Sequence, residues 1–300
     1  MKIITLLPAA SEIICQLGLS DNLKGVSHEC DYPKVVMDKI RVTSSIIPKS
    51  TNQKEIDLIV KRAIEKNIPL FEIDNEKILE INPDLIITQG LCEVCSISKN
   101  KIEAKFNQTP CKLYNKTKIV SLNGKTFKEI CQDVLKIGEI VNKEVTAKKL
   151  ICEAVSKSYN ITNKKFNKNI LLLEWIDPYF SPGHWIPEQI EMAGFFSSIG
   201  KKGEKSREIS NEELSYLNPD YIGLICCGYN FEENKLFAQK LYNDDKIKHL
   251  EAIKKEQVFA FDSNAYFSRP SLRIIEGAIQ INEALMQNND KFRCKKFYSG

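Results

Sequence analysis

The sharpest chemical signal in this sequence is a pair of cysteines two residues apart, Cys92-x-x-Cys95. Two thiols at this spacing can hold half of a zinc or iron–sulfur site, or form a redox pair. The chain has no second Cys-x-x-Cys, so further ligands must approach through space, from Cys30, His28, Cys226 or Cys227. We predict a metal-binding or cobalt-contacting site formed by Cys92 and Cys95 with Cys30 or His28. The alternative is that these thiols pack beneath a loop.

A second group of candidate residues is aromatic and polar, and it lies in segments that follow predicted strands. Ligands of open parallel sheets bind beyond the carboxyl ends of the strands. Aromatic side chains with a few polar groups are typical of small-molecule sites. We therefore expect a ligand to contact His28, Glu29, Asp31, Tyr32, Trp175, Asp177, His184, Trp185, Tyr229, Tyr266, Phe267 and Arg269.

Three of these residues allow two interpretations. His184 could ligate the metal of a bound cofactor, or it could hydrogen-bond a loop carbonyl. Trp175 and Trp185 could be cleft walls for a planar ligand, or ordinary core residues. The chain contains neither a Gly-x-Gly-x-x-Gly nor a Walker loop nor a Gly-x-Ser-x-Gly elbow, which argues against phosphate-cradling and serine-nucleophile chemistry.

The elements that must position these residues alternate between strand and helix. Apolar runs predict strands, and residues spaced by three and four predict helices between them. The predicted strands are 3–7, 24–27, 70–73, 85–88, 170–175, 221–225 and 258–261. This alternation predicts parallel sheets with helices on their faces.

The run from Lys125 to Ser158 separates the two halves of the pattern. Its apolar residues recur at helical spacing, and Thr126 with Glu129 forms a capping box. As one helix it would be roughly 50 Å long. We predict a single connecting helix over 125–159 between lobes at 1–124 and 160–286, with a tail at 287–300. The alternative is two shorter helices broken near Asn142.

An internal echo indicates that the two lobes are related. Asn82-Pro83-Asp84 and Asn218-Pro219-Asp220 each follow a short predicted helix and precede an apolar strand. Proline ends a helix and disfavours helical angles in the residue before it. The predicted fold is therefore α/β, with two Rossmann-like lobes and mostly parallel sheets.

Composition excludes some partners. The formal charge of +4 is spread along the chain without an arginine-rich run, which argues against nucleic acid as a partner. No apolar run approaches 18 residues, so we expect a protein that is not embedded in a membrane. The first residues, Met1-Lys2-Ile3-Ile4-Thr5, lead straight into a predicted strand, without an export signal or lipobox. We expect a cytoplasmic protein with reduced cysteines, or an exported one if the true start lies upstream.

Several motifs resemble one known family. Leu6-Leu7-Pro8-Ala9-Ala10-Ser11-Glu12-Ile13 resembles the opening of the iron-complex and cobalamin substrate-binding proteins of ABC transporters. The later motifs resemble its cobalamin-binding branch; they are His28-Glu29-Cys30-Asp31-Tyr32-Pro33, Cys92-Glu93-Val94-Cys95, Trp175-Ile176-Asp177-Pro178, Gly183-His184-Trp185 and Asn264-Ala265-Tyr266-Phe267-Ser268-Arg269-Pro270.

The resemblance implies two α/β lobes joined by a rigid helix, with a ligand clamped between them. It implies a cobalamin-like corrinoid or another metal chelate as ligand and, if the protein is exported, an ABC permease as partner. Members dock on the permease through an acidic residue on each lobe, and Glu12 and Glu188 are the guesses for that role here. The second hypothesis is a cytoplasmic enzyme or metallochaperone with zinc or an iron–sulfur cluster at Cys92 and Cys95.

Overall fold

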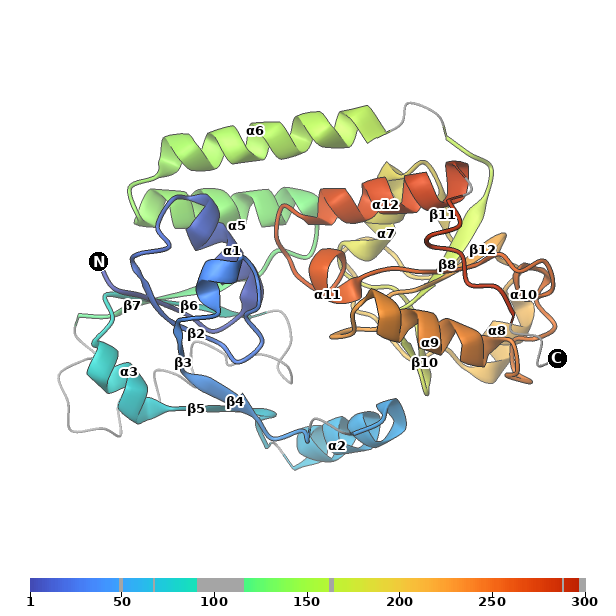
Figure 1. Cartoon of the computed structure of the whole chain (residues 1–300), viewed down its shortest axis with the longest axis horizontal. Coiled ribbons are helices and arrows are strands. Elements are labelled where there is room, and N and C mark those ends of the chain that lie inside the picture. The colour runs from blue at the N-terminus through green and yellow to red at the C-terminus, as the bar shows by residue number, and fades with distance from the viewer. Residues whose placement is uncertain (49–50, 67, 91–115, 162–164, 288, 297–300) are drawn as a thin grey trace. The chain divides into compact units, whose positions relative to one another are not determined.

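The computed structural model describes residues 1–48, 51–66, 68–90, 116–161, 165–287 and 289–296 (Figure 1). The chain forms two units, one of residues 1–124 and 128–150 and the other of residues 125–127 and 151–300. We refer to them as unit 1 and unit 2. No helix in the described ranges is both long and apolar enough to cross a membrane.

Unit 1 is built on a parallel sheet with β1 (Ile3–Thr5) at its centre. The strand order is β3-β2-β1-β6-β7, and every neighbouring pair is parallel. The other strands are β2 (Leu23–Val26), β3 (Ile40–Arg41), β6 (Leu85–Gln89) and β7 (Lys118–Leu122). Helix α1 (Pro8–Gln16) follows β1, and α3 (Asn75–Ile81) precedes β6. The predicted parallel α/β class is confirmed for this unit, although the sequence pattern does not predict β7.

One predicted strand of unit 1 lies outside the parallel sheet. β5 (Phe71–Ile73) pairs antiparallel with β4 (Thr43–Ser45) in a separate two-stranded sheet. The expectation that this strand extends the parallel sheet is therefore wrong. Its connection from β4 runs through α2 (Gln53–Glu65), whose first turn carries a full capping box between Asn52 and Glu55. A short 3₁₀ helix, Lys34–Val36, precedes β3.

Unit 2 has its own parallel sheet, in the order β11-β8-β12-β13. The strands are β8 (Asn169–Leu173), β11 (Phe196–Ser197), β12 (Tyr221–Leu224) and β13 (Val258–Ala260). An antiparallel hairpin of β9 (Trp175–Ile176) and β10 (Tyr179–Phe180) follows β8. The helices are α7 (Ile186–Met192), α8 (Asn211–Tyr216), α9 (Phe231–Leu241), α10 (Glu251–Lys254), α11 (Ser263–Tyr266) and α12 (Ile274–Met286).

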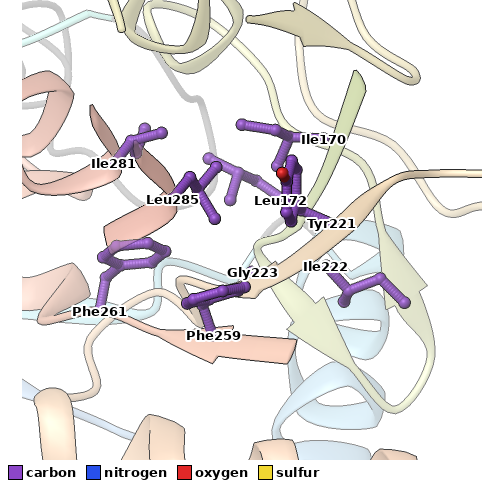
Figure 2. A pocket seen from close by; sticks show the side chains of 9 residues that line it. All are labelled: Ile170, Leu172, Tyr221, Ile222, Gly223, Phe259, Phe261, Ile281 and Leu285. Carbon is purple, nitrogen blue, oxygen red and sulfur yellow. The ribbon is translucent and has the colours of Figure 1, made fainter. Parts of the chain in front are cut away.

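Both faces of the unit 2 sheet are buried, because successive side chains of a strand point to opposite faces. Leu171, Leu173 and Leu224 belong to a core cluster that includes Ala238 and Leu241 of α9. On the other face, a gap with aliphatic and aromatic walls lies between the sheet and α12, as Figure 2 shows for Leu172, Phe259, Ile281 and Leu285. It is a packing gap in the core whose lining is apolar apart from Tyr221, unlike the convergent polar groups of a ligand site.

The predicted single helix between the lobes is wrong, and the two-helix alternative is confirmed. Helix α5 (Phe127–Ile140) ends, and α6 (Glu144–Ile161) begins after a turn in which Asn142 has a φ of 57°. The Asn142 N–H donates to the Glu139 carbonyl and the Lys143 N–H to the Gly138 carbonyl, which is the Schellman pattern of a helix end. Asparagine tolerates this left-handed conformation better than most residues, so it ends the helix. Helix α6 passes from unit 1 to unit 2 at residue 150.

The Asn-Pro-Asp echo is a structural repeat. In unit 1 the Lys2 N–H donates to Oδ2 of Asp84 at 2.6 Å, and in unit 2 the Asn169 N–H donates to Oδ2 of Asp220 at 2.9 Å. In each unit, the aspartate that precedes one strand therefore holds the start of the neighbouring strand. The predicted relation between the lobes is confirmed at this level.

Candidate functional site

The central strand of unit 2 ends at the residues most suited to ligand contact. Strand order changes direction at β8, with β11 on one side and β12 on the other, and such switch points are where α/β sheets bind ligands. Trp175 follows β8 and packs against Tyr229 with ring centroids 5.7 Å apart, and both side chains are half-buried. The Trp175 indole N–H donates to the carbonyl of Asp177, an exposed residue of the hairpin turn.

Hydrogen bonds tie the loops at this edge to one another. The Cys227 N–H donates to the carbonyl of Glu174, which joins the loop after β12 to the segment after β8. Asn234, fully buried on α9, accepts from the Cys226 N–H and donates to the carbonyl of Phe261 after β13. The side chain of Asn234 thus fixes two strand-end loops at once. The edge carrying the aromatic pair is therefore rigidly built.

His184 occupies a constrained turn of the same unit. Its φ is 53°, its N–H donates to the Glu204 carbonyl, and its own carbonyl accepts from the Gly203 N–H. Burial first, then the charges of Lys125 and Lys205, lower the pKa of His184. Its Nδ1 atom is buried and has no hydrogen-bond partner within the described ranges. A neutral, half-buried imidazole of this kind is suited to metal ligation.

Glu174 holds the turn that carries His184. One of its carboxylate oxygens, Oε1, accepts the Gly183 N–H at 2.7 Å, and the carboxylate also accepts a hydrogen bond from the Ser206 hydroxyl. Burial raises the pKa of Glu174 to about 7 against these two hydrogen bonds. There is no room for a side chain at Gly183, because a Cβ there would lie 2.2 Å from the Ser206 nitrogen. The turn is thus pressed against the 203–207 loop.

Three residues predicted to contact ligand lie in the interior instead. Trp185 is 5% exposed, and its indole N–H donates to the Phe267 carbonyl at 2.8 Å. Phe267 is 1% exposed, and Arg269 is 5% exposed and donates to Oδ1 of Asn264. These side chains are engaged in packing within unit 2, and their role as ligand contacts stays a prediction. Tyr266 is half-buried beneath the Arg273 guanidinium, which lies 4.9 Å from the ring centroid.

In unit 1, the predicted residues gather after β2. The Nδ1 atom of His28 lies 2.7 Å from the Thr43 hydroxyl, and its ring packs against Phe71 with centroids 5.1 Å apart. Burial, and secondarily the nearby Arg41 guanidinium, lower the pKa of His28. The remaining predicted residues of this loop are exposed; they are Glu29, Asp31 and Tyr32.

The predicted role of Cys30 in metal binding is not supported by its surroundings. Cys30 is 1% exposed, and its Sγ lies 3.1 Å from the hydroxyl of Ser11. Burial raises the pKa of the Cys30 thiol, which disfavours the thiolate that metals require. Within the described ranges, no group of three or more His, Cys, Asp or Glu residues could hold a metal ion. Cys92 and Cys95 lie outside the described residues.

The two acidic residues guessed to dock on a permease are not surface groups in this structure. Glu12 is fully buried in α1. Glu188 is 8% exposed; its carboxylate pairs with Lys202 and accepts the Phe127 N–H at 2.7 Å. Both carboxylates are buried here, and their docking role stays a prediction. Glu188 fastens the first residue of α5 within unit 2.

Asn234, Gln189 and Glu174 are supporting residues that the sequence patterns do not reveal. Gln189 is fully buried, and its side-chain amide donates to the carbonyls of Tyr266 and Ile274. One usable signal is the position of Asn234 on the same helical face as Ala238 and Leu241, where a polar residue must have buried partners. The partners themselves are distant in sequence and leave no local pattern.

Comparison with known proteins gives a consistent picture. The model of a family described as periplasmic binding protein matches residues 3–265. A search of curated proteins found no match. Among solved structures, an ABC transporter substrate-binding protein from Listeria monocytogenes EGD-e is 20% identical, with a TM-score of 0.68 over 96% of this chain and 99% of that chain.

Two further similar structures have a stated ligand. The periplasmic vitamin B12-binding protein BtuF of Vibrio cholerae is 21% identical, with a TM-score of 0.67 over 95% of this chain and 96% of that chain. IsdE of S. aureus, solved in complex with heme, is 16% identical, with a TM-score of 0.68 over 94% of this chain and 97% of that chain. At these identities the likeness establishes the shared fold.

Proposed function

Because this chain belongs to the periplasmic binding protein family, we propose that it is a substrate-binding protein of an ABC transporter whose ligand is a planar metal chelate, first of all a cobalamin-like corrinoid. It binds this ligand and delivers it to a permease, without chemical conversion. The ligand class is supported by the motifs that resemble the cobalamin-binding branch. It is also supported by structural neighbours that bind vitamin B12 or heme.

The observation that carries the proposal is the Trp175–Tyr229 pair at the carboxyl edge of the unit 2 sheet. A flat macrocycle offers a large apolar face, and its burial against a half-exposed aromatic pair is favourable. His184, in the segment between β10 and α7, adds an imidazole whose lowered pKa keeps it largely neutral at pH 7. A neutral imidazole can ligate the metal of such a chelate.

The hydrogen bonds between the strand-end loops add to this argument. Asn234 and the Cys227 N–H hold the segments around Trp175 and Tyr229 before any ligand arrives. Ordering of side chains and loops is one of the main costs of binding, and a preformed edge avoids part of it. Unit 2 therefore offers the ligand a largely prebuilt face.

The test is an absorbance titration of the purified protein with hydroxocobalamin, repeated with hemin. We expect saturable binding with a spectral change for hydroxocobalamin. Trp175→Ala should weaken binding at least tenfold, the equivalent of about 1.4 kcal/mol. The matched control is Tyr216→Ala, which removes a ring that is 81% exposed on α8, before β12 begins. Binding of neither compound, or equal loss in both variants, would overturn the proposal; binding of hemin alone would move the ligand class to porphyrins.

A further inference from the structure

The last described residues of the chain cover the open edge of the unit 2 sheet. Strand order leaves β13 at this edge, and the unpaired backbone groups of an edge strand need a partner or a cover. The Ala260 N–H donates to the Phe292 carbonyl at 2.9 Å. The Cys294 N–H donates to the Val258 carbonyl at 2.8 Å, and the pairing is antiparallel. Residues 292–295, which we call the C-terminal segment, therefore close the sheet beside β13.

Helix α9 also holds the C-terminal segment. The hydroxyl of Tyr242, the residue that ends this helix, donates to the Cys294 carbonyl. The side-chain amide of Gln239 donates to the Lys295 carbonyl at 2.8 Å. The side chains of Phe292 and Cys294 are buried, with 4% and 2% of their surface exposed. The segment is therefore a packed part of unit 2, fastened to both β13 and α9.

The direction of the C-terminal segment places Phe292 at the edge of the sheet that carries the candidate site. Because the segment runs antiparallel to β13, its first residue, Phe292, lies beside Ala260, the last residue of that strand. The Phe292 ring packs against Phe261, which follows β13, and against Phe231, the first residue of α9. The ring centroids lie 5.5 Å and 6.0 Å apart in these two pairs, within the range of favourable aromatic contacts. Phe292 therefore joins the end of β13 to the start of α9.

Tyr229 is held by the same two parts of unit 2. It precedes α9, and its carbonyl accepts a hydrogen bond from the side-chain amide of Asn234, on that helix, at 3.3 Å. The same carbonyl accepts the N–H of Asn264, in the segment after β13, at 3.1 Å. The Asn234 amide also donates to the Phe261 carbonyl at 3.0 Å. The backbone of Tyr229 therefore depends on how α9 and the end of β13 sit against each other.

We infer that Phe292 is a positioning residue of the candidate site, which keeps Tyr229 in place against Trp175. It acts through its two ring contacts, which fix the start of α9 relative to the end of β13. A site that is held before the ligand arrives has less ordering to do on binding. The inference rests on the proposed function, because the position of Tyr229 matters for affinity if the ligand contacts this aromatic pair. The family match ends at residue 265, so the contribution comes from a part of the chain beyond it.

The experiment measures the order of the aromatic pair separately from ligand binding. The chain has two tryptophans, and Trp185 is 5% exposed, so quenching of fluorescence by acrylamide reports mainly on Trp175. The variant is Phe292→Ala in the full chain. The matched control is Leu250→Ala, which empties an equally buried site in the segment leading into the start of β13. Each protein is quenched with acrylamide, titrated with hydroxocobalamin and unfolded in urea.

We expect Phe292→Ala to raise the quenching constant about twofold, because Tyr229 no longer holds its place beside Trp175. Binding of hydroxocobalamin should weaken roughly tenfold, because the freed side chain must be ordered again by the ligand. Leu250→Ala should match the parent in both measurements although its loss of stability in urea is similar. If Phe292→Ala does not fold, the comparison is made with Phe292→Leu, for which we expect a smaller loss of affinity, roughly threefold.

Equal changes in the Phe292 and Leu250 variants, or no change in the Phe292 variant, would overturn the inference, since Phe292 would then support the fold alone. The proposed function would still stand if the parent protein bound the corrinoid. A raised quenching constant in the Phe292 variant, with neither hydroxocobalamin nor hemin bound by the parent, would support the positioning role and defeat the proposed function. The two proposals can therefore fail separately.

Discussion

Residues of one type have different roles in unit 2 because their surroundings differ. Trp175 packs against Tyr229 and keeps part of its surface exposed. Trp185, ten positions later, is buried, and its indole N–H donates to the Phe267 carbonyl. Both tryptophans follow the same strand, so the sequence leaves their roles as alternatives. The structure separates them through a contact between residues 82 positions apart.

Alanine at the two tryptophans should therefore destabilise the protein to different extents. Trp185→Ala empties a buried site and leaves the Phe267 carbonyl without its donor, so we expect a loss of about 3–5 kcal/mol of unfolding free energy. Trp175→Ala should cost about 1–2 kcal/mol, because the ring is only half-buried. Urea denaturation of both variants measures the difference. Similar losses in both would contradict the assignment of Trp185 to the core.

Glu174 should make the stability of the protein depend on pH. Its pKa is raised from 4.5 to about 7 on folding, so the folded state favours the protonated form. The stability that follows is fully present below about pH 4.5 and is lost as pH rises towards 7. Glu174→Gln keeps an acceptor for the Gly183 N–H without a charge. We expect the variant to be about 1–3 kcal/mol more stable than the parent at pH 8 and equal to it near pH 4.5.

Denaturant unfolding of both proteins between pH 4.5 and 8 checks this expectation through the difference between the two curves. Burial also raises the pKa of Asp133, so this residue adds its own pH dependence to both stability curves. Because Asp133 is present in both proteins, its contribution cancels when one curve is subtracted from the other. A difference that does not change with pH would show that Glu174 has an ordinary pKa.

The sequence predicts which loops carry the candidate site, but it does not predict the hydrogen bonds that hold those loops together. The strand-end rule identified the segments with Trp175, His184 and Tyr229, because strand ends can be read from local hydrophobic patterns. It also included Phe267 and Arg269, which are buried. The hydrogen bonds of Asn234 and Glu174 were missed, because their partners are set by tertiary packing. Local sequence carries no record of such pairs.

At the scale of elements, most strands and helices agree with their sequence patterns. Continuous apolar runs such as Leu171-Leu172-Leu173 are typical of strands buried on both faces, and they are the centre of the unit 2 sheet. β5 was misassigned to the parallel sheet because its pattern does not encode its partner. The break at Asn142 was underestimated, because apolar residues continue at helical spacing across the turn, although Val145 on its far side is 84% exposed.

Gly138 allows α5 and the first turns of α6 to pack closely against each other. Alanine normally stabilises a helix by about 1 kcal/mol over glycine. At this position, however, a Cβ would lie 2.5 Å from the Cβ of Ala147 and 3.2 Å from the Lys143 carbonyl oxygen. We expect Gly138→Ala to destabilise unit 1 by about 1–3 kcal/mol, because the two helices must move apart.

A double-mutant cycle with Ala147→Gly tests the contact directly. If the two Cβ atoms are what clash, the double variant should recover at least about 1 kcal/mol relative to the sum of the single changes. Thermal unfolding of the four proteins gives this coupling. Additive effects would mean that Gly138 matters through backbone freedom and not through close approach to Ala147.

At the scale of the whole molecule, the chain repeats one plan twice. Each unit has a parallel sheet whose central strand starts at a bond to an Asn-Pro-Asp aspartate, Asp84 or Asp220. The chain passes between the units near residues 124, 127 and 150. Residues 125–127 belong to unit 2 although they precede α5, and the bond from the Phe127 N–H to Glu188 explains this placement. The sequence predicts the repeat, but it does not predict that residues 125–127 belong to unit 2, because Glu188 lies 61 positions away from Phe127.

A protein built to bind a ligand should gain stability from it in proportion to occupancy. A ligand that binds only the folded chain at a hundred times its Kd adds about 2.7 kcal/mol to the free energy of unfolding. With about 2 °C per kcal/mol for a chain of this size, the midpoint of thermal unfolding should rise by roughly 5 °C. We expect this for the corrinoid, with the rise continuing logarithmically at higher concentration. In Trp175→Ala, the rise relative to the ligand-free variant should require at least tenfold higher ligand concentration, since the ring contributes to affinity. A midpoint that stays constant over this range would show that the folded chain does not recognise the corrinoid, whatever the resemblance of its motifs.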